Sequence, residues 1–129
     1  MSPRERRSQE RIGFRVPAHI TVGKAREVHK GYLINLSASG AFIMMDRVVP
    51  LAGIIELYFH PRDGGECRAR GKAAHVTSVG IGQSFGVVLD WSDDAFRKFV
   101  EGLAKASDRD LVDLLKDMRR IHIRVAADE

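Results

Sequence analysis

The chain has little of what several protein classes require. Cys67 is its single cysteine, so no internal disulfide can form, which agrees with a reducing compartment. The longest uninterrupted apolar run, 41–45, is far shorter than a membrane span. The N-terminal residues are polar and lack the apolar core of a signal peptide. From these absences we expect a cytoplasmic protein.

The chain also lacks the side-chain patterns of common active sites. Its five histidines are scattered, with no pair at helical spacing and no cysteine pair, so we expect no metal site. Cys67 and His75 have no evident third group to orient them as a nucleophile and base. The glycines of 80–86 precede a strand-like run, whereas a dinucleotide fingerprint opens a helix. We therefore expect neither an enzyme nor a cofactor.

Positive charge is the main excess, and it is concentrated at one end. The formal net charge is +4, and residues 1–15 contain five arginines against two glutamates. A basic arm of this kind suits an anionic partner such as a nucleotide, a nucleic acid or an acidic membrane surface. Aromatic residues make up only 7% of the chain and most fall at plausible core positions. A nucleic-acid surface would need outward aromatics for base stacking, so we expect no nucleic acid.

Short alternating runs predict a mainly β domain. Residues that alternate between apolar and polar, or short apolar runs, are bounded by glycine, proline and Asp63-Gly64 turn signals. The six predicted strands are approximately 18–22, 27–36, 41–45, 54–59, 67–79 and 84–89. Gly71 lies inside the fifth and predicts a bulge or bend. Six short strands at fairly regular spacing favour a closed or nearly closed antiparallel barrel.

Two helices are predicted after the last of these strands. Ser92 and the acids that follow it are suited to a helix N-terminus, and Ser107 with Asp110 forms a second capping pattern. Each helix has one apolar stripe, formed by Phe96, Phe99, Val100 and Leu103 in the first and by Leu111, Leu114, Leu115 and Met118 in the second. The stripe of the second helix, 108–120, packs on the domain or forms an interface; we favour packing. The tail 121–125 alternates briefly.

Two short motifs carry the functional prediction. Arg11 and Arg15 are separated by three residues in an RxxxR pattern, and Asn35, Ser37 and Gly40 form an NxSxxG pattern at the end of a predicted strand. In this order and at this distance they resemble the two-part signature of the PilZ family. The resemblance covers roughly residues 6–105, and the family's six-stranded barrel with a helix matches the predicted elements.

The resemblance implies a ligand, the bacterial second messenger cyclic di-GMP. This compact molecule has two phosphodiester charges and two guanines. Arginine forks grip phosphate oxygens or guanine acceptors in pairs, and their flat faces stack on purines. Asn35 can accept from guanine donors and Ser37 can donate to phosphate. Gly40 would permit a close backbone approach or a positive φ.

The chain departs from the family pattern at two positions. Asn35 stands where aspartate is more usual, and Glu10 precedes Arg11 where many members carry a basic or apolar residue. The position of Glu10 affects how many ligands stack, so stoichiometry stays open. Arg7 and Arg11 also fit the RxxxR spacing. We prefer Arg11 and Arg15 because Arg15 leads directly into the first strand. Arg7 and Arg6 would add a further phosphate or stacking contact.

The predicted organisation has three parts: a flexible basic arm over 1–15, a PilZ barrel with its helix over 16–105, and an additional helix and tail over 106–129. We predict a cyclic di-GMP receptor that orders its arm over the barrel and so changes the surface offered to a downstream protein partner. The alternative is a PilZ-like interaction adaptor with weak or no nucleotide binding. The pathway, the partner and the oligomeric state stay open.

Overall fold

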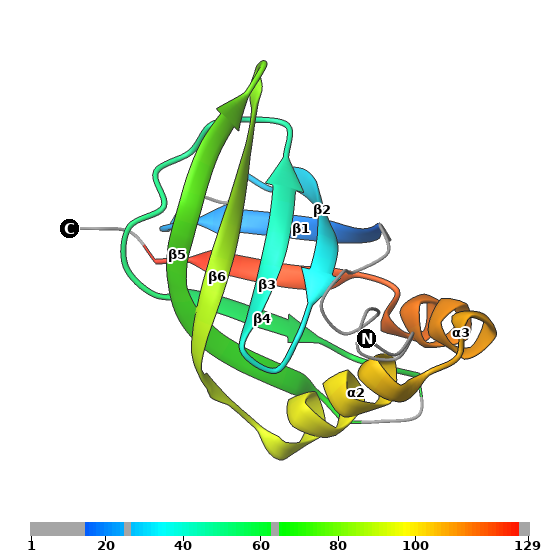
Figure 1. The fold of residues 1–129 in the computed structure, drawn as a ribbon. Helices are drawn as coiled ribbons and strands as arrows, with labels where there is room; N and C mark the ends of the chain where they lie inside the picture. Colours follow the sequence, from blue (N-terminus) through cyan, green and yellow to red (C-terminus); the bar gives the residue numbers. More distant parts are fainter. Residues whose placement is uncertain (1–14, 25–26, 63–64, 127–129) are drawn as a thin grey trace.

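A computed structural model of the chain describes residues 15–24, 27–62 and 65–126. Within these residues the chain forms seven strands and two helices (Figure 1). In chain order they are β1 (Val16–Val22), β2 (His29–Leu36), β3 (Gly40–Met45), β4 (Ile55–Phe59), β5 (Cys67–Val79), β6 (Gly82–Ser92), α2 (Asp94–Lys105), α3 (Asp108–Met118) and β7 (Ile121–Val125). No helix of this described part is both long and apolar enough to cross a membrane.

The strands of the described residues close into one barrel in the order β1-β2-β3-β6-β5-β4-β7. All neighbours are antiparallel except β1 and β7, which run parallel with Ala18 opposite Ile121. The predicted mainly β barrel with two helices is confirmed, but the predicted count of six strands is one short. The additional strand is β7, formed by the tail 121–125. The helices α2 and α3 connect it to β6 and lie at one end of the barrel. β1 and β7 can pair in parallel because most of the chain, and not a tight turn, connects them.

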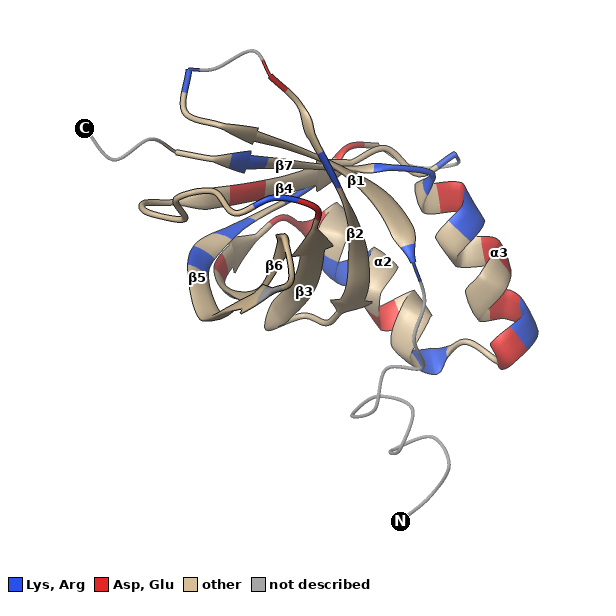
Figure 2. Ribbon diagram, turned by 90° about the horizontal axis from the view of Figure 1, so that it is seen from above, with Lys and Arg blue, Asp and Glu red and all other residues tan. Residues whose placement is uncertain are grey.

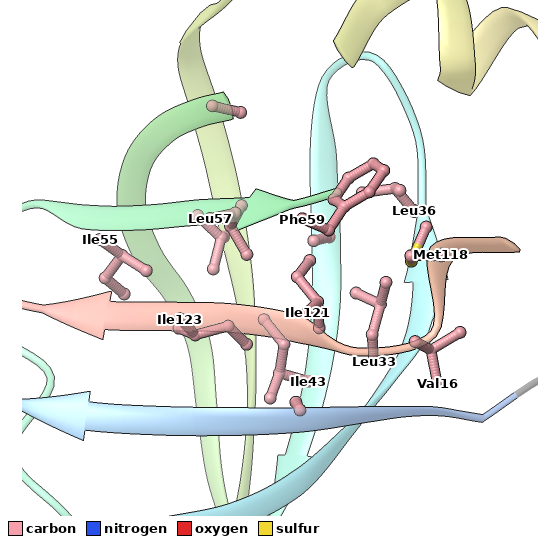
Figure 3. Packing of buried hydrophobic residues seen from close by; sticks show 14 of the residues in the cluster. Val16, Leu33, Leu36, Ile43, Ile55, Leu57, Phe59, Met118, Ile121 and Ile123 are labelled. Atoms are coloured by element: carbon pink, nitrogen blue, oxygen red, sulfur yellow. The ribbon is translucent and has the colours of Figure 1, made fainter. Parts of the chain in front are cut away.

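The core fills the inside of the barrel and continues beneath the helices at one end. In β7 the inward residues Ile121, Ile123 and Val125 are each at most 1% exposed. Figure 3 shows Ile121 and Ile123 projecting into the same space as Ile43 and Leu57. Five residues alternating over two faces are enough to bury three aliphatic side chains. The last strand therefore belongs to the core as fully as the first six.

Both helices begin at a side-chain cap and pack on the barrel. Asp93, rather than the predicted Ser92, caps α2: its carboxylate accepts from the Phe96 N–H at 2.8 Å and from the Arg68 N–H of β5 at 3.1 Å. Ser92 instead ends β6. Ser107 caps α3 as predicted, accepting from the Asp110 N–H at 3.2 Å. Because Asp93 binds both α2 and β5, it fixes the point at which the chain passes from β6 into α2.

The apolar stripe of α3 packs within the chain. Met118 is 1% exposed and belongs to the core, and Leu111, Leu114 and Leu115 are partly buried against it. Val112, outside that stripe, is 50% exposed. The preference for packing over an interface is therefore confirmed for the stripe itself.

Gly71 marks a bend in the long strand β5, as predicted. The pairing of β5 with β6 shifts register between Arg70 and Gly71. A Cβ at Gly71 would lie 2.0 Å from the Val88 carbonyl oxygen, so only glycine allows the two strands to approach this closely. The bend lets one strand follow the curve of the barrel from β4 to β6.

Candidate functional site

The motif residues that the structure describes lie at one end of the sheet β1-β2-β3. Val16 pairs with Leu33 in antiparallel register, so Arg15, directly before Val16, lies toward the end of β2 that contains Asn35. The β2–β3 turn follows there, and Gly40 begins β3. Arg11, Arg7 and Arg6 lie outside the described residues. The predicted proximity of Arg15 to the polar cluster is thus supported by strand register.

A β-bulge changes the direction of the side chains before the turn. The pairing of β2 with β3 shifts register between Leu33 and Asn35. Leu33 and Leu36 are both buried, and the two residues between them, Ile34 and Asn35, are both only partly buried. A regular strand would turn one of those two inward, because side chains alternate between faces. The bulge therefore holds Asn35 off the core.

Ser37 holds the β2–β3 turn together. Its hydroxyl oxygen accepts from the Ser39 N–H at 3.3 Å and the Gly40 N–H at 3.2 Å, and lies 3.3 Å from the Gly40 carbonyl, to which it can donate. The Ser37 N–H also donates to the Gly40 carbonyl at 2.8 Å. A hydroxyl has one donor and two lone pairs. In this arrangement all three are used within the turn, so Ser37 has a structural role.

Gly40 is required because β3 and β6 lie close together at this residue, and not because of its backbone conformation. The positive-φ glycines among the described residues are Gly23, Gly53 and Gly80, so the suggestion that Gly40 adopts a positive φ is wrong. A Cβ at Gly40 would lie 2.8 Å from the Val87 carbonyl oxygen of β6. Any larger residue would push β6 away from β3 at the point where the turn leaves the sheet.

An open hollow of about 460 Å³ lies on the outer face of β1, β2 and β3, beside Arg15. Its described lining is Arg15, Pro17, Ala18, His19, Lys30, Gly31, Tyr32, Ile34, Met44, Met45 and Asp46. The Arg15 guanidinium lies over the Tyr32 ring, 5.5 Å from its centroid. Tyr32 is 44% exposed, so its ring is available at the surface. The hollow ends at Ile34, and Asn35, Ser37 and Gly40 lie beyond that lining.

The hollow combines features that suit a planar, anionic ligand. Tyr32 and Met44 supply an apolar surface, and Arg15 and Lys30 supply two cations against one carboxylate, Asp46. His19 adds no charge at neutral pH, because partial burial lowers its pKa and repulsion from Arg120 and Lys30 lowers it further. A stacking surface beside two cations is the chemistry that binds a nucleotide.

Sequence reasoning missed Tyr32 and Lys30. The signal was present, because both share one parity in β2 while Gly31 and Leu33 share the other. A lysine on one face of a strand indicates which face meets solvent, so Tyr32 could have been assigned outward.

Cys67 has no role in the hollow. It is 2% exposed, and its pKa is raised to about 11 by burial, with the carboxylates Asp93 and Glu66 adding to the effect. The thiol is therefore protonated at neutral pH and is a poor nucleophile. Among the residues that the structure describes, no group of three histidine, cysteine or acidic side chains is arranged to hold a metal ion.

A second outward face contains rings that contact a neighbouring ring or guanidinium. Tyr58 stacks on His122 with centroids 4.9 Å apart, and the Arg68 guanidinium lies 5.3 Å from the same ring. Arg70 covers Trp91 at 4.6 Å. The expectation that most aromatics are core residues thus fails for Tyr32, Tyr58 and Trp91. Cross-strand contacts of this kind stabilise a sheet. Trp91 stays 42% exposed, close to the 44% of Tyr32.

A model of the family described as PilZ domain matches residues 5–105. The chain belongs to the PilZ family. This match confirms the resemblance seen in the sequence motifs. PilZ domains are cyclic di-GMP-binding domains and are not enzymes. Comparison with curated proteins found no match, and comparison with solved structures found none.

The PilZ match ends at Lys105, the last residue of α2. In this PilZ domain the barrel is nevertheless closed by β7, which lies beyond the matched residues. The segment 106–125 therefore contributes structure that the family model does not include. Its helix α3 also lies beside the start of β1, where it lines a neighbouring hollow together with Arg15.

Proposed function

We propose that this PilZ domain is a non-enzymatic receptor that binds cyclic di-GMP against the outer face of β1, β2 and β3. The observation that carries the proposal is Arg15 lying over Tyr32 beside the hollow of about 460 Å³, in a chain of the PilZ family. That volume is typical of pockets for small ligands. A guanine can stack beside Tyr32 while Arg15 and Arg11 bind the phosphodiester groups.

The polar cluster would complete the site at the end of β2. The Asn35 amide can accept from guanine N1 or N2 and donate to an acceptor. It is held off the core by the bulge that follows Leu33. Ser37 would act through the shape of the turn, because its hydroxyl is used in bonds to Ser39 and Gly40. Arg7 remains a candidate for a further phosphate contact.

A calorimetric titration tests the proposal directly. Cyclic di-GMP should bind with a saturable heat, whereas GTP and a short oligonucleotide should bind at least tenfold more weakly. GTP shares the guanine and the phosphates but not the compact cyclic dianion. Heat with the oligonucleotide alone would indicate a nucleic-acid-binding barrel, and no heat with any of the three would favour the adaptor alternative. One observation favours the adaptor alternative: the Ser37 hydroxyl is already bonded within the turn, so it is not available to a phosphate.

Substitutions in the polar cluster should separate binding from folding. We expect Asn35→Ala to weaken cyclic di-GMP binding about two- to tenfold, since a neutral hydrogen bond contributes ~0.5–1.5 kcal/mol. The barrel should stay folded without ligand. Ser37→Ala should instead lower the free energy of unfolding by about 0.5–1.5 kcal/mol, because the turn loses its bonds. Calorimetry and thermal melting of each variant check both expectations.

Ser39→Ala is the matched control for these variants, since among the described residues its exposed hydroxyl contacts one side chain, the Ser37 hydroxyl at 3.3 Å. It should leave affinity and melting close to wild type. If Asn35→Ala lost binding and unfolded together, the cluster would be a turn element and not part of the ligand site. Unchanged affinity in the Asn35/Ser37 double variant would remove the cluster from the site altogether.

We further propose that ligand binding orders residues 1–15 over the barrel, which changes the surface met by a downstream partner. Hydrogen exchange followed by mass spectrometry should show the amides of 1–15 exchanging rapidly without ligand and becoming protected with saturating cyclic di-GMP. Contacts from Arg11 can form only if this segment gives up conformational freedom. Amides of α3 should be protected in both states, because its apolar stripe is packed.

The Arg15→Ala variant at the same ligand concentration provides the control, because weaker binding there should reduce protection of the same amides. Saturated binding with no change in the exchange of 1–15 would disprove the ordering mechanism while leaving receptor function intact.

A further inference from the structure

Arg15 borders two hollows, and the second extends onto α3, which lies outside the family match. This neighbouring hollow, of about 400 Å³, has the described lining Arg15, Val16, Pro17, Val112, Leu115, Lys116 and Arg119. Arg15 and Pro17 also line the hollow beside Tyr32. The two hollows therefore adjoin across the start of β1. Figure 2 shows basic residues at the start of β1 and along α3 on the same side of the barrel.

The second hollow is cationic over an apolar floor. Val16, Pro17, Val112 and Leu115 supply the apolar part. Arg15, Lys116 and Arg119 supply the charge, and no carboxylate is among the described residues that line it. The acidic Asp117 of α3 is paired elsewhere, 3.8 Å from Arg62. Within the described part of the chain, no ion pair is found for Lys116 or Arg119.

The backbone presents Arg119 in an unusual conformation. Its φ is 62° and its ψ is −72°, and the Arg120 N–H donates to the Met118 carbonyl at 2.7 Å. This is the strained form of the three-residue γ-turn, which residues other than glycine rarely adopt. Met118 on one side and Ile121 on the other are at most 1% exposed, and their burial holds the turn. Arg119 is thereby fixed beside Lys116 instead of continuing the helix.

Basic residues near a helix C-terminus are common because they complement the helix dipole. The helix dipole accounts for the presence of Lys116 and Arg119 near the end of α3. It does not explain why they share a hollow with Arg15, which belongs to the start of β1. Three cations from two elements around one apolar floor raise the local positive potential, which favours an anion at this place.

We propose that Lys116 and Arg119 extend the cyclic di-GMP site across Arg15 onto α3, where they bind a phosphodiester oxygen of the same ligand. The inference rests on the proposed function and adds a part of the chain that the family motif does not contain. A ligand held by Arg15 is adjacent to both hollows. Its second charge would meet Lys116 and Arg119 while a guanine contacts Tyr32. Ligand binding would then also be coupled to α3 and to the strand β7 that follows it.

The test uses the full chain and calorimetric titration with cyclic di-GMP. The variants are Lys116→Gln and Arg119→Gln, which remove the charge but keep an unbranched polar side chain. Neither introduces a glycine, so the backbone at residue 119 gains no new freedom. The matched control is Arg109→Gln, which removes the same charge from the first turn of α3, outside both hollows. Each test variant should bind about three- to tenfold more weakly than the control, and the double variant at least tenfold, because exposed charge-assisted contacts are partly screened by solvent. Arg119→Lys should restore part of the loss.

The outcomes separate this inference from the function on which it depends. If the wild type binds and both test variants match Arg109→Gln, the site does not include α3 and only this inference is overturned. If the wild type shows no binding, the receptor function itself fails and this inference with it. Equal melting temperatures for the three variants without ligand, within about 2 °C, show that a weaker affinity is not caused by loss of folding.

Discussion

Ending the chain after Met118 is expected to abolish the folded barrel, even though the family match lies wholly within the remaining residues. The deletion removes β7, which pairs with both β1 and β4. It would expose two strand edges and discard Ile121, Ile123 and Val125, which are all buried. Each buried aliphatic side chain contributes ~1.5–3 kcal/mol, and a domain has only about 5–15 kcal/mol in total. Circular dichroism and urea denaturation should show a largely unfolded or aggregated chain.

A single substitution in β7 tests its contribution to stability with a smaller change. Ile123→Ala should lower the free energy of unfolding by about 2–5 kcal/mol, the usual cost of a cavity at a fully buried position. The neighbour Arg124 is exposed on the opposite face of the same strand, so Arg124→Ala should stay within about 0.5 kcal/mol of wild type. If the chain ending at Met118 kept the urea midpoint of the full chain, β7 would be dispensable and the closed barrel incorrect.

Arg11→Ala and Arg15→Ala are each expected to weaken cyclic di-GMP binding at least tenfold. A hydrogen bond to a charged group contributes ~1.5–3 kcal/mol, and tenfold in affinity corresponds to about 1.4 kcal/mol. Without ligand the melting temperature should barely change. Arg15 is exposed, and its contact with the half-exposed Tyr32 ring stabilises the fold by at most about 0.5–1 kcal/mol. Calorimetry and thermal melting measure the two effects separately.

Two further variants refine the arginine test. Arg124→Ala removes the same charge from β7, outside both hollows, and should bind within about twofold of wild type. Tyr32→Phe retains a ring for stacking and should bind normally, whereas Tyr32→Ala should lose affinity, since base stacking contributes ~1–3 kcal/mol. Wild-type affinity in both arginine variants would mean that the basic segment is not part of the site.

Much of the architecture was predictable because it depends on local patterns. The strand 67–79 was bounded correctly, and its bend at Gly71 was anticipated, because glycine inside a strand indicates a close approach or a bulge. The caps of the helices were nearly correct. Ser107 was assigned to the right residue, and the first cap was placed one residue early because Ser92 remains paired with Ala69 in the sheet. Pairing across strands is not visible in a local pattern.

The candidate site was only half predictable. The RxxxR and NxSxxG patterns, through their resemblance to the PilZ signature, made Arg15 and the β2–β3 turn candidates, and strand register places both at the same end of the sheet. The roles inside the turn depended on distances that spacing does not give. Ser37 proved to use its hydroxyl within the turn, and Gly40 is required by the Val87 carbonyl of β6 and not by a positive φ. Both facts involve atoms brought together by the fold.

The sequence by itself determined the family, the mainly β class and the position of the Asn35 motif at the end of a strand, because motif spacing and alternation are properties of the chain. Tertiary structure alone decided the seventh strand, since whether 121–125 pairs with β1 and β4 depends on where α3 delivers it. It alone also decided that Tyr32 lies beneath Arg15 and that Lys116 and Arg119 border the same residue. Such contacts join segments distant in sequence, and only the closing of the barrel brings them within range of one ligand.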